Sequence, residues 1–188
     1  VLTAHTLKNL GLNLADVAKI ESDDKKVRER LVNFRKSLVV DEKEMAKMIS
    51  AGIARLIDFQ HGDGGWGWWK QGESNPYLTA YVVSGLVIAR DAGVALPEGM
   101  IDRGVAFLAQ AAALAGPVKE YPWQTGDNTS LRTYMLYAIG QATSARLKEP
   151  DLAKQLRRMF EDRDDLTDYA RALLAIALAD GGLNEEAS

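Results

Sequence analysis

Residues 78–89 read LTAYVVSGLVIA, and similar stretches return at residues 131–142 (LRTYMLYAIGQA) and 166–177 (LTDYARALLAIA). Apolar residues recur in all three at helical spacing, without the alternation that is typical of a strand. Superposing the three stretches aligns a tyrosine at the fourth position and an aliphatic residue five positions later: Tyr81, Tyr134 and Tyr169, then Leu86, Ile139 and Leu174. The chain therefore contains one helix in three copies.

A partner helix precedes a copy in two places. Residues 52–60 (GIARLIDFQ) and residues 104–110 (GVAFLAQ) are similar to each other, and each comes before the next copy of the repeated helix. Helix pairs repeated in this way stack into a solenoid or close into a ring, the α/α toroid. We predict an all-α fold, an α/α toroid of repeated helix pairs, with residues 1–188 forming one partial toroid domain. The alternative is an irregular helical bundle.

Composition excludes several classes of protein. The 188 residues include 47% hydrophobic residues and carry a net charge of −3, which does not favour binding to DNA or RNA. The absence of cysteine excludes a disulfide framework and a thiolate metal site. No apolar run approaches the roughly 20 residues of a membrane span. The chain opens VLTAHTLKNLGL, without Met or a leader, and we expect this to be an internal cut.

Loops of an antiparallel helix stack alternate between its two ends. We therefore expect the loops at residues 61–76, 116–128 and 161–166 to share one end, which would hold all four tryptophans, Trp66, Trp68, Trp69 and Trp123. The repeated helices also begin at this end, after Asn75, Asn128 and Asp165, which are good helix caps. We expect function to be concentrated there.

The loop between the first two pairs contains a turn signature, because residues 59–69 read FQHGDGGWGWW. We predict that Gln60 ends a helix, that Asp63 accepts hydrogen bonds from its own turn, and that Gly64 and Gly65 provide positive φ. This turn would lay Trp66 across the helix ends, either as a filler between helix pairs or as part of a pocket.

Trp68 and Trp69 are adjacent and cannot both face inward, so at least one should line a pocket or an interface with a neighbouring domain. The aromatic candidates for this surface are Trp66, Trp68, Trp69, Tyr77, Tyr121 and Trp123. A pure interaction module, in which the tryptophans form a docking patch, is one alternative function.

Polar residues give weaker signals. His5 and His61 lack further ligands at metal spacing, so we expect no metal and no cofactor. Residues 162–165 read DRDD and match the D-x-D-D acid of class II terpene cyclases, although a solvated cap in a charged stretch also explains them. Four acidic residues are expected at the same end as the tryptophans: Asp63, Glu73, Glu120 and Asp127. Paired carboxylates beside aromatic side chains are typical of a carbohydrate-active toroid enzyme, which is a second alternative function.

Residues 60–93, QHGDGGWGWWKQGESNPYLTAYVVSGLVIARDAG, resemble the thioester-containing domain of the alpha-macroglobulin family, in particular its bacterial members. Residues 4–12 are similar to the segment that follows the family's Cys-x-Glu-Gln thioester motif. DGGW alone is weak evidence, since terpene cyclases carry a similar Q-x-x-D-G-x-W turn in the same architecture, but DGGWGWW followed by NPYLTAYVV is specific.

This resemblance implies a fragment of a large periplasmic, cell-envelope or secreted protease inhibitor. A protease cuts its bait region, and the exposed thioester then acylates the protease. The chain has no cysteine, so we expect the thioester upstream of residue 1 and no enzymatic activity in this fragment. The implied partners are the parent's neighbouring domains and target proteases. Residues 116–128, GPVKEYPWQTGDN, lack the histidine with which complement-type relatives redirect the acyl group to hydroxyls, which favours amines as acceptors.

Overall fold

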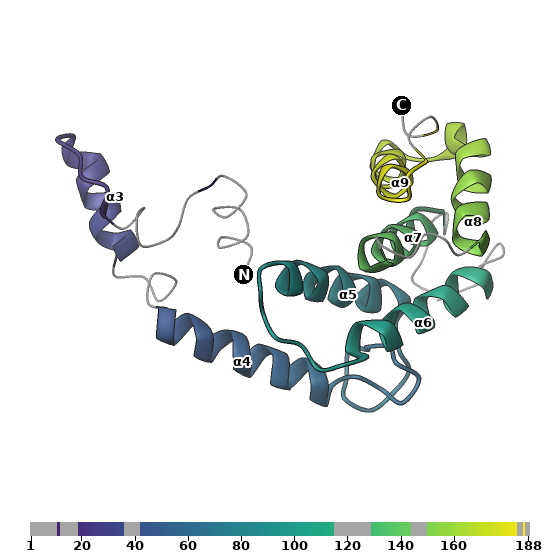
Figure 1. The fold of residues 1–188 in the computed structure, drawn as a ribbon, viewed down its shortest axis with the longest axis horizontal. Helices are drawn as coiled ribbons and strands as arrows, with labels where there is room; N and C mark the ends of the chain where they lie inside the picture. Colours follow the sequence, from purple (N-terminus) through teal and green to yellow (C-terminus); the bar gives the residue numbers. More distant parts are fainter. Residues whose placement is uncertain are drawn as a thin grey trace. The chain divides into compact units, whose positions relative to one another are not determined.

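The computed structural model describes residues 11, 19–35, 42–114, 129–143, 150–183 and 186 (Figure 1). Within these residues every regular element is a helix, apart from an isolated bridge between Gln60 and Trp66. The helices are α3 (Lys25–Arg35), α4 (Glu42–Asp58), α5 (Pro76–Asp91), α6 (Met100–Leu114), α7 (Thr129–Thr143), α8 (Pro150–Glu161) and α9 (Asp168–Asp180), with a 3-10 turn, η1 (Arg163–Asp165). The all-α prediction is confirmed.

The chain divides into two compact units, residues 1–58 with 88–96 and residues 59–87 with 97–188. The expectation of one partial toroid domain stays a prediction. The first unit contains α3, which begins where Asp24 Oδ1 accepts hydrogen bonds from the backbone N–H groups of Lys26 and Val27. It also contains α4, whose half-buried side chains repeat every three or four residues: Met45, Ile49, Ile53 and Leu56.

The second unit begins with the loop that leads into α5. Asn75 Oδ1 accepts a hydrogen bond of 3.0 Å from the Leu78 N–H, and Pro76 occupies the first helical position, where the lack of an N–H costs nothing. One face of α5 is buried at helical spacing and contributes Thr79, Ala80, Val83, Leu86 and Val87 to the core. The predicted start of this repeat copy is therefore confirmed.

Glycine allows α6 to approach α5 closely. A Cβ atom built on Gly104 would lie 2.7 Å from Val83 Cγ2 and 2.9 Å from Trp66 Cζ3. Both neighbouring side chains are fully buried, so they have little room to move. Gly104 thus sets the spacing between α5, α6 and the indole of Trp66.

The second and third copies of the repeat form α7 and α9, which also pack closely. A Cβ atom on Gly140 would lie 4.0 Å from backbone and side-chain atoms of Ala177. The helix α9 begins at Thr167, whose hydroxyl accepts a hydrogen bond from the Ala170 N–H, and not at Asp165, which lies in the 3-10 turn. The predicted cap at Asp165 is wrong because the chain inserts one further turn between α8 and α9.

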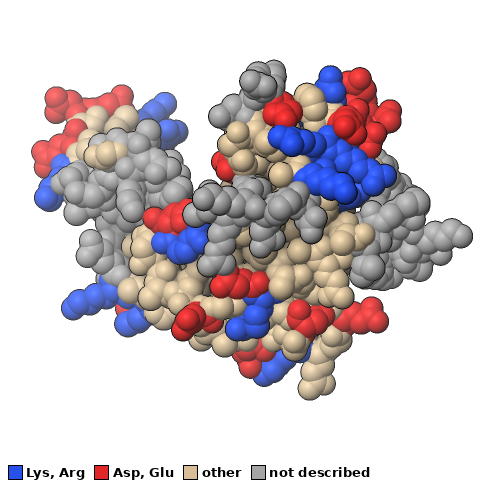
Figure 2. Space-filling model, turned by 45° about the vertical axis from the view of Figure 1, so that its right-hand side comes forward, with Lys and Arg blue, Asp and Glu red and all other residues tan. Residues whose placement is uncertain are grey.

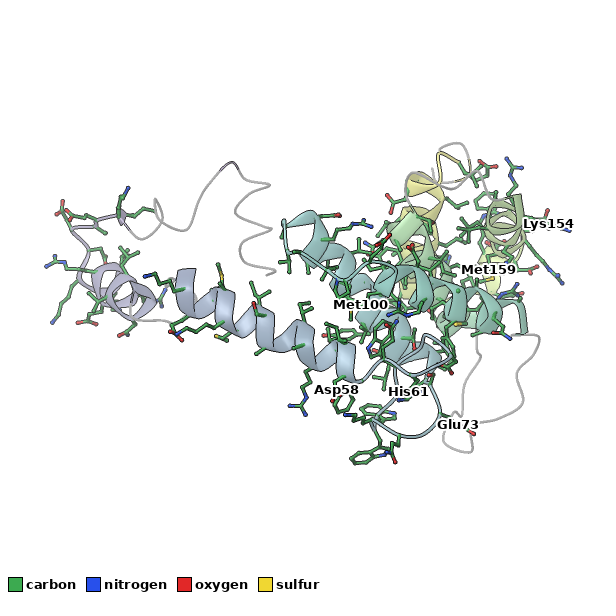
Figure 3. All side chains as sticks on the ribbon, turned by 60° about the horizontal axis from the view of Figure 1, so that its bottom comes forward. Asp58, His61, Glu73, Met100, Lys154 and Met159 are labelled. Carbon is green, nitrogen blue, oxygen red and sulfur yellow. The ribbon has the colours of Figure 1, made fainter. Side chains whose placement is uncertain are left out.

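Between these two copies lies α8, which is strongly amphipathic. Leu152, Leu156 and Met159 are buried, whereas Lys154 is exposed, and Figure 3 shows Met159 and Lys154 on different sides of the helix. On the face shown in Figure 2, acidic and basic side chains are interspersed. The largest cluster of Lys and Arg side chains there is bordered by Asp and Glu side chains. The described side chains on this face form no extended field of one sign.

Candidate functional site

Gln60 and Asp63 organise the turn before the tryptophans. The Gln60 side chain donates hydrogen bonds from Nε2 to the carbonyls of Gly64 (2.9 Å) and Met100 (3.0 Å), and its Oε1 accepts one from Arg103 (2.6 Å). Asp63 Oδ1 accepts hydrogen bonds from the Gly65 N–H (3.0 Å) and from Ser74 Oγ (2.7 Å). Hydrogen bonds thus hold the turn together internally and also link it to α6.

The turn glycines act through two different physical requirements. Gly64 has a φ of +90°, and a Cβ atom there would lie 2.5 Å from the carbonyl oxygen of Arg103. The predicted positive φ at Gly65 is wrong. That position needs glycine for space instead, because a Cβ atom there would lie 2.6 Å from Ser74 Cβ. Gly67 is equally confined, since a Cβ atom added there would lie 2.5 Å from the Glu73 carbonyl oxygen.

His61 ties the two arms of the loop together, a role that the sequence did not predict. Its Nδ1 lies 2.9 Å from Ser74 Oγ, and its Nε2 lies 3.0 Å from the backbone carbonyl oxygen of Trp69. Figure 3 shows His61 and Glu73 on this loop. Although His61, Ser74 and Asp63 are the residue types of a hydrolase triad, the carboxylate here binds the serine and not the histidine. The arrangement therefore serves structure and does not activate a nucleophile.

The tryptophans of this loop divide into one core residue and two surface residues. Trp66 is 2% exposed, and its backbone N–H donates a hydrogen bond of 2.9 Å to Thr79 Oγ1. Trp68 and Trp69 are 71% and 76% exposed. Trp66 thus fills the space between α5 and α6, and of the three tryptophans on this loop Trp68 and Trp69 are the accessible ones. Tyr121 and Trp123 lie outside the described residues.

Tyrosines from the three repeat helices gather on one side of the second unit. The rings of Tyr77 on α5 and Tyr134 on α7 have centroids 5.6 Å apart, and those of Tyr134 and Tyr137 are 6.2 Å apart. Burial raises the pKa of Tyr134 to about 12, with smaller contributions from the neighbouring Tyr169 and Tyr77, and burial also raises the pKa of Tyr137. Their hydroxyl groups therefore stay protonated at physiological pH.

The acidic candidates do not form a catalytic pair in the described residues. The Asp63 carboxylate accepts two hydrogen bonds within its own loop, and Glu73 is exposed. Glu120 and Asp127 lie outside the described residues. The DRDD stretch is exposed along its whole length, which contrasts with the apolar cavity that a cyclase acid needs for protonation. The interpretation of this stretch as a solvated surface segment is therefore favoured.

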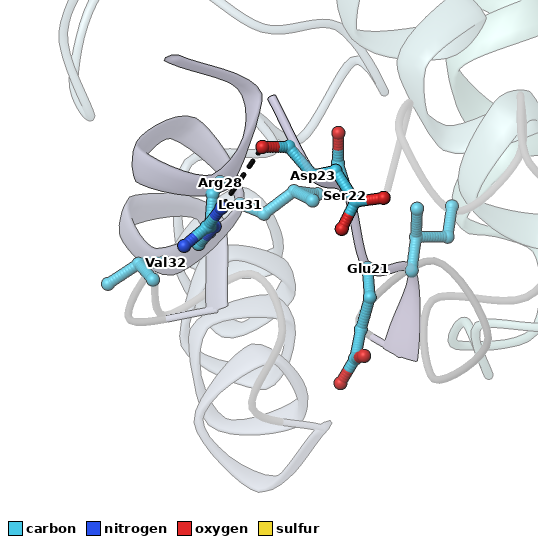
Figure 4. Close-up of a pocket in the computed structure, with 7 residues that line it drawn as sticks. Glu21, Ser22, Asp23, Arg28, Leu31 and Val32 are labelled. Carbon is cyan, nitrogen blue, oxygen red and sulfur yellow. Dashed lines mark hydrogen bonds between the residues drawn. The ribbon is translucent and has the colours of Figure 1, made fainter. Parts of the chain in front are cut away.

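Other kinds of site are scarce among the described residues. No three His, Cys, Asp or Glu side chains there come close enough to hold a metal ion, and no described helix is long and apolar enough to cross a membrane. A hollow of about 620 Å³ in the first unit is lined by Ile20, Glu21, Ser22, Asp23, Arg28, Leu31 and Val32 (Figure 4). Within it, Arg28 donates a hydrogen bond of 3.0 Å to the Asp23 carbonyl oxygen.

Comparison with known families decides the relationship. The family model of the A-macroglobulin TED domain, the thioester-containing domain, matches residues 27–185, which is most of the chain. The chain belongs to this family. Alpha-2-macroglobulin of Escherichia coli K12 is 32% identical to this TED-family chain over 126 residues, which are 66% of the chain and 7% of that protein. Alpha-2-macroglobulin of Thermotoga maritima is 36% identical over 69 residues, 37% of the chain and 4% of that protein.

Solved structures of alpha-2-macroglobulins show the same fold. The E. coli protein from domain MG7 to the C-terminus resembles this TED-family chain with a TM-score of 0.61 and 24% identity, covering 92% of the chain and 24% of that structure. The Salmonella protein reacted with methylamine gives a TM-score of 0.58 and 23% identity, covering 92% and 10%. These likenesses confirm the α/α toroid class. The matched part of the chain covers only 4% and 7% of the two curated alpha-2-macroglobulins.

A terpene-cyclase relationship is weaker but visible. Drimenyl diphosphate synthase of Streptomyces showdoensis is 31% identical to this TED-family chain over 111 residues, 55% of the chain and 20% of that enzyme. In this chain Gln60, Asp63 and Trp66 of the Q-x-x-D-G-x-W turn have fold-forming roles, so the turn by itself indicates a fold and not a function.

Proposed function

We propose that this chain is part of the thioester-containing domain of an alpha-macroglobulin-like protein that traps proteases. The observation that carries this proposal is the TED-domain match across residues 27–185, which spans the repeated helix pairs α5 to α9. The exposed DRDD stretch and the engaged carboxylate of Asp63 argue against the cyclase and glycosidase alternatives. In this proposal the chain is an inhibitor domain and has no enzymatic activity of its own.

The reacting group would be a thioester between a cysteine and a glutamine side chain upstream of residue 1, since the chain contains no cysteine. An amine of the trapped protease attacks the thioester carbonyl carbon, the carbon–sulfur bond breaks, and the sulfur leaves as a thiolate while an amide forms. In this proposal the chain provides the protein surface that surrounds the thioester.

We propose that lysine amines of the trapped protease accept the acyl group of the thioester. Residues 116–128 contain no histidine that could take the acyl group and pass it to a hydroxyl, as complement-type relatives do. Direct attack then favours the stronger nucleophile, an amine over an alcohol.

The accessible aromatic side chains are proposed to shield the thioester from water before activation, because an apolar surround slows hydrolysis. Trp68, Trp69 and Tyr77 are exposed and available for this contact, whereas buried Trp66 acts only by shaping the loop. Tyr121 and Trp123 complete the proposed set. The parent protein is proposed to lie outside the cytoplasm, with its own neighbouring domains and target proteases as partners.

A labelling experiment on the full-length polypeptide tests this function. Methylamine should release one free thiol and become attached to the upstream glutamine, whereas glycerol at the same concentration should give far less product, both measured by mass spectrometry. Efficient glycerol ester formation would contradict the amine preference. A full-length sequence without Cys-x-Glu-Gln upstream would contradict the thioester itself.

Shielding is tested separately through spontaneous thiol release in the absence of protease. Trp68→Ala should accelerate this release without changing the unfolding temperature, because the side chain is 71% exposed and contributes little to the core. Tyr81→Ala is a matched control, since Tyr81 is also exposed and belongs to the same unit, but lies within α5 and not in the loop. Equal release in both variants and the parent would show that Trp68 does not shield the group.

A further inference from the structure

His61, Ser74 and Asp63 form a hydrogen-bonded network in the loop of residues 61–75. His61 Nδ1 lies 2.9 Å from Ser74 Oγ, and Ser74 Oγ donates a hydrogen bond of 2.7 Å to Asp63 Oδ1. On the other side of the ring, His61 Nε2 lies 3.0 Å from the backbone carbonyl oxygen of Trp69. Each of these three contacts is short enough to be a hydrogen bond, and each needs one proton between its two atoms.

Counting these protons shows which form of His61 completes the network. A carboxylate and a backbone carbonyl only accept hydrogen bonds, and a serine hydroxyl has one proton to donate. Asp63 Oδ1 accepts that proton from Ser74, in addition to a hydrogen bond from the Gly65 N–H. Toward His61, the Ser74 oxygen can then only accept, as can the carbonyl oxygen of Trp69. His61 must therefore donate from both ring nitrogens, which only the doubly protonated ring does.

A neutral His61 ring leaves one of the three contacts without a proton. If Nε2 keeps its proton, the Ser74 hydroxyl can serve either Nδ1 or Asp63, but not both. If Nδ1 keeps the proton instead, the bare Nε2 faces the carbonyl oxygen of Trp69 at 3.0 Å. Every neutral arrangement thus brings two lone pairs together at hydrogen-bonding distance and loses one hydrogen bond.

The packing around the network prevents these atoms from moving apart. Ser74 is 8% exposed, and a Cβ atom built on Gly65 would lie 2.7 Å from its Oγ. The ring is confined as well, because a Cβ atom on Gly67 would lie 2.9 Å from His61 Cε1. The loss of a proton from His61 therefore weakens the closed loop, since its atoms cannot rearrange without displacing their neighbours.

The charged residues near the network in the chain are mostly acidic. Four acids and two bases lie on the loop, at the end of α4 and in the first turn of α6: Asp58, Asp63, Glu73, Asp102, Lys70 and Arg103. The Arg103 side chain donates a hydrogen bond of 2.6 Å to Gln60 Oε1. The helix α5, which follows the loop, contains no charged residue before Arg90. This balance accommodates a positive charge on the ring of His61.

We propose that this loop is a pH-sensitive switch, held closed by the doubly protonated ring of His61 and loosened when the ring loses a proton. The stabilisation is fully present at acidic pH and is lost as the pH rises through the range in which histidine side chains titrate. The part released is the arm of residues 67–73, because His61 holds it at Trp69 and at Ser74. The pH therefore controls how rigidly the exposed side chains of Trp68 and Trp69 are presented.

Hydrogen exchange of backbone amides in the full-length polypeptide tests the switch. Exchange is measured by mass spectrometry at about pH 5 and about pH 8, which lie on either side of the histidine range. Each rate is divided by that of an unstructured peptide of the same sequence at the same pH, so that the intrinsic pH dependence of exchange cancels. We expect the protection of residues 60–75 to be about tenfold greater at the lower pH, which corresponds to roughly 1.4 kcal/mol, or one hydrogen bond. Residues 168–180 in α9 should show equal protection at both.

Three substitutions assign the pH response to this network. His61→Gln keeps an amide donor but removes the titrating ring, and Ser74→Ala removes the hydroxyl that forces Nδ1 to donate. Both variants should lose the difference between the two pH values. His5→Gln is the matched control, because it changes the only other histidine of the chain and should leave the difference intact. Each variant is compared with itself at the two pH values, so a uniform loss of stability does not alter the result.

Several outcomes would overturn the proposal. Equal protection of residues 60–75 at the two pH values would show that the loop does not respond to the protonation of His61, and greater protection at the higher pH would reverse the sign of the argument. A pH response that survives both His61→Gln and Ser74→Ala, or that disappears in His5→Gln, would assign the response to another group. None of these outcomes bears on the thioester function, which is read from methylamine-dependent thiol release.

Discussion

Gly104→Ala should destabilise the protein even though it improves helix propensity. The added methyl group would lie 2.7 Å from Val83 Cγ2 and 2.9 Å from Trp66 Cζ3, and both of these side chains are buried. Overpacking of a core costs about 1–3 kcal/mol. Replacing glycine by alanine within a helix returns about 0.5–1 kcal/mol. The expected net loss in the free energy of unfolding is about 1.3 kcal/mol at the middle of these ranges, which together allow about 0–2.5 kcal/mol.

Gly85→Ala provides the matched control, because it makes the same substitution within α5, where no atom lies within 4 Å of the added methyl group. This variant should gain about 0.5–1 kcal/mol. Urea unfolding followed by far-ultraviolet circular dichroism measures both, with midpoints expected on opposite sides of the parent. A Gly104→Ala protein as stable as the Gly85→Ala protein would refute the argument that Gly104 sets the spacing of α5, α6 and Trp66.

Three further perturbations test the turn, the cap and the tyrosines. Ser74→Ala should cost about 1–3 kcal/mol in urea unfolding, because it leaves Asp63 and His61 without the hydroxyl that lies between them. Thr167→Ala should cost about 1 kcal/mol, read as a lower unfolding temperature, whereas Thr167→Ser should not, since the serine hydroxyl still caps α9. Burial raises the pKa of Tyr134 to about 12, so the unfolded chain loses this proton first, and the stabilisation that is present below about pH 10 should disappear as the pH rises toward 12. Tyr134→Phe should remove the latest step from the tyrosinate absorbance titration and weaken this alkaline destabilisation.

The fold was predictable where the signal was local. The start of α5 at Asn75 and Pro76 follows from residues that are adjacent in the sequence, and so does the hydrogen bonding of Asp63 within its own turn. The start of α9 was misplaced because Asp165 and Thr167 are both good caps, and only tertiary packing selects the second.

The candidate site was less predictable because its contacts join distant segments. Nothing beside Gln60 in the sequence indicates that its side chain binds Met100 and Arg103 on the next helix pair. The adjacency of Trp68 and Trp69 predicted that they would not both face inward, but it could not show that both are exposed. His61 gave no sequence signal, since its role depends on a loop that returns to it 8 and 13 residues later.

The bonds from Gln60 to α6 also bear on synthesis of the protein. Its partners Met100 and Arg103 lie 40 and 43 positions further along the chain. A ribosome adds about 5–20 residues per second, so the turn waits roughly 2–9 s after it is made for the groups that fasten it. During that interval Trp66, Trp68 and Trp69 are all unburied in the nascent chain, because α6 is not yet there to cover Trp66. A chaperone that binds aromatic segments would thus find Trp66 accessible during that interval, whereas this side chain is 2% exposed in the folded protein.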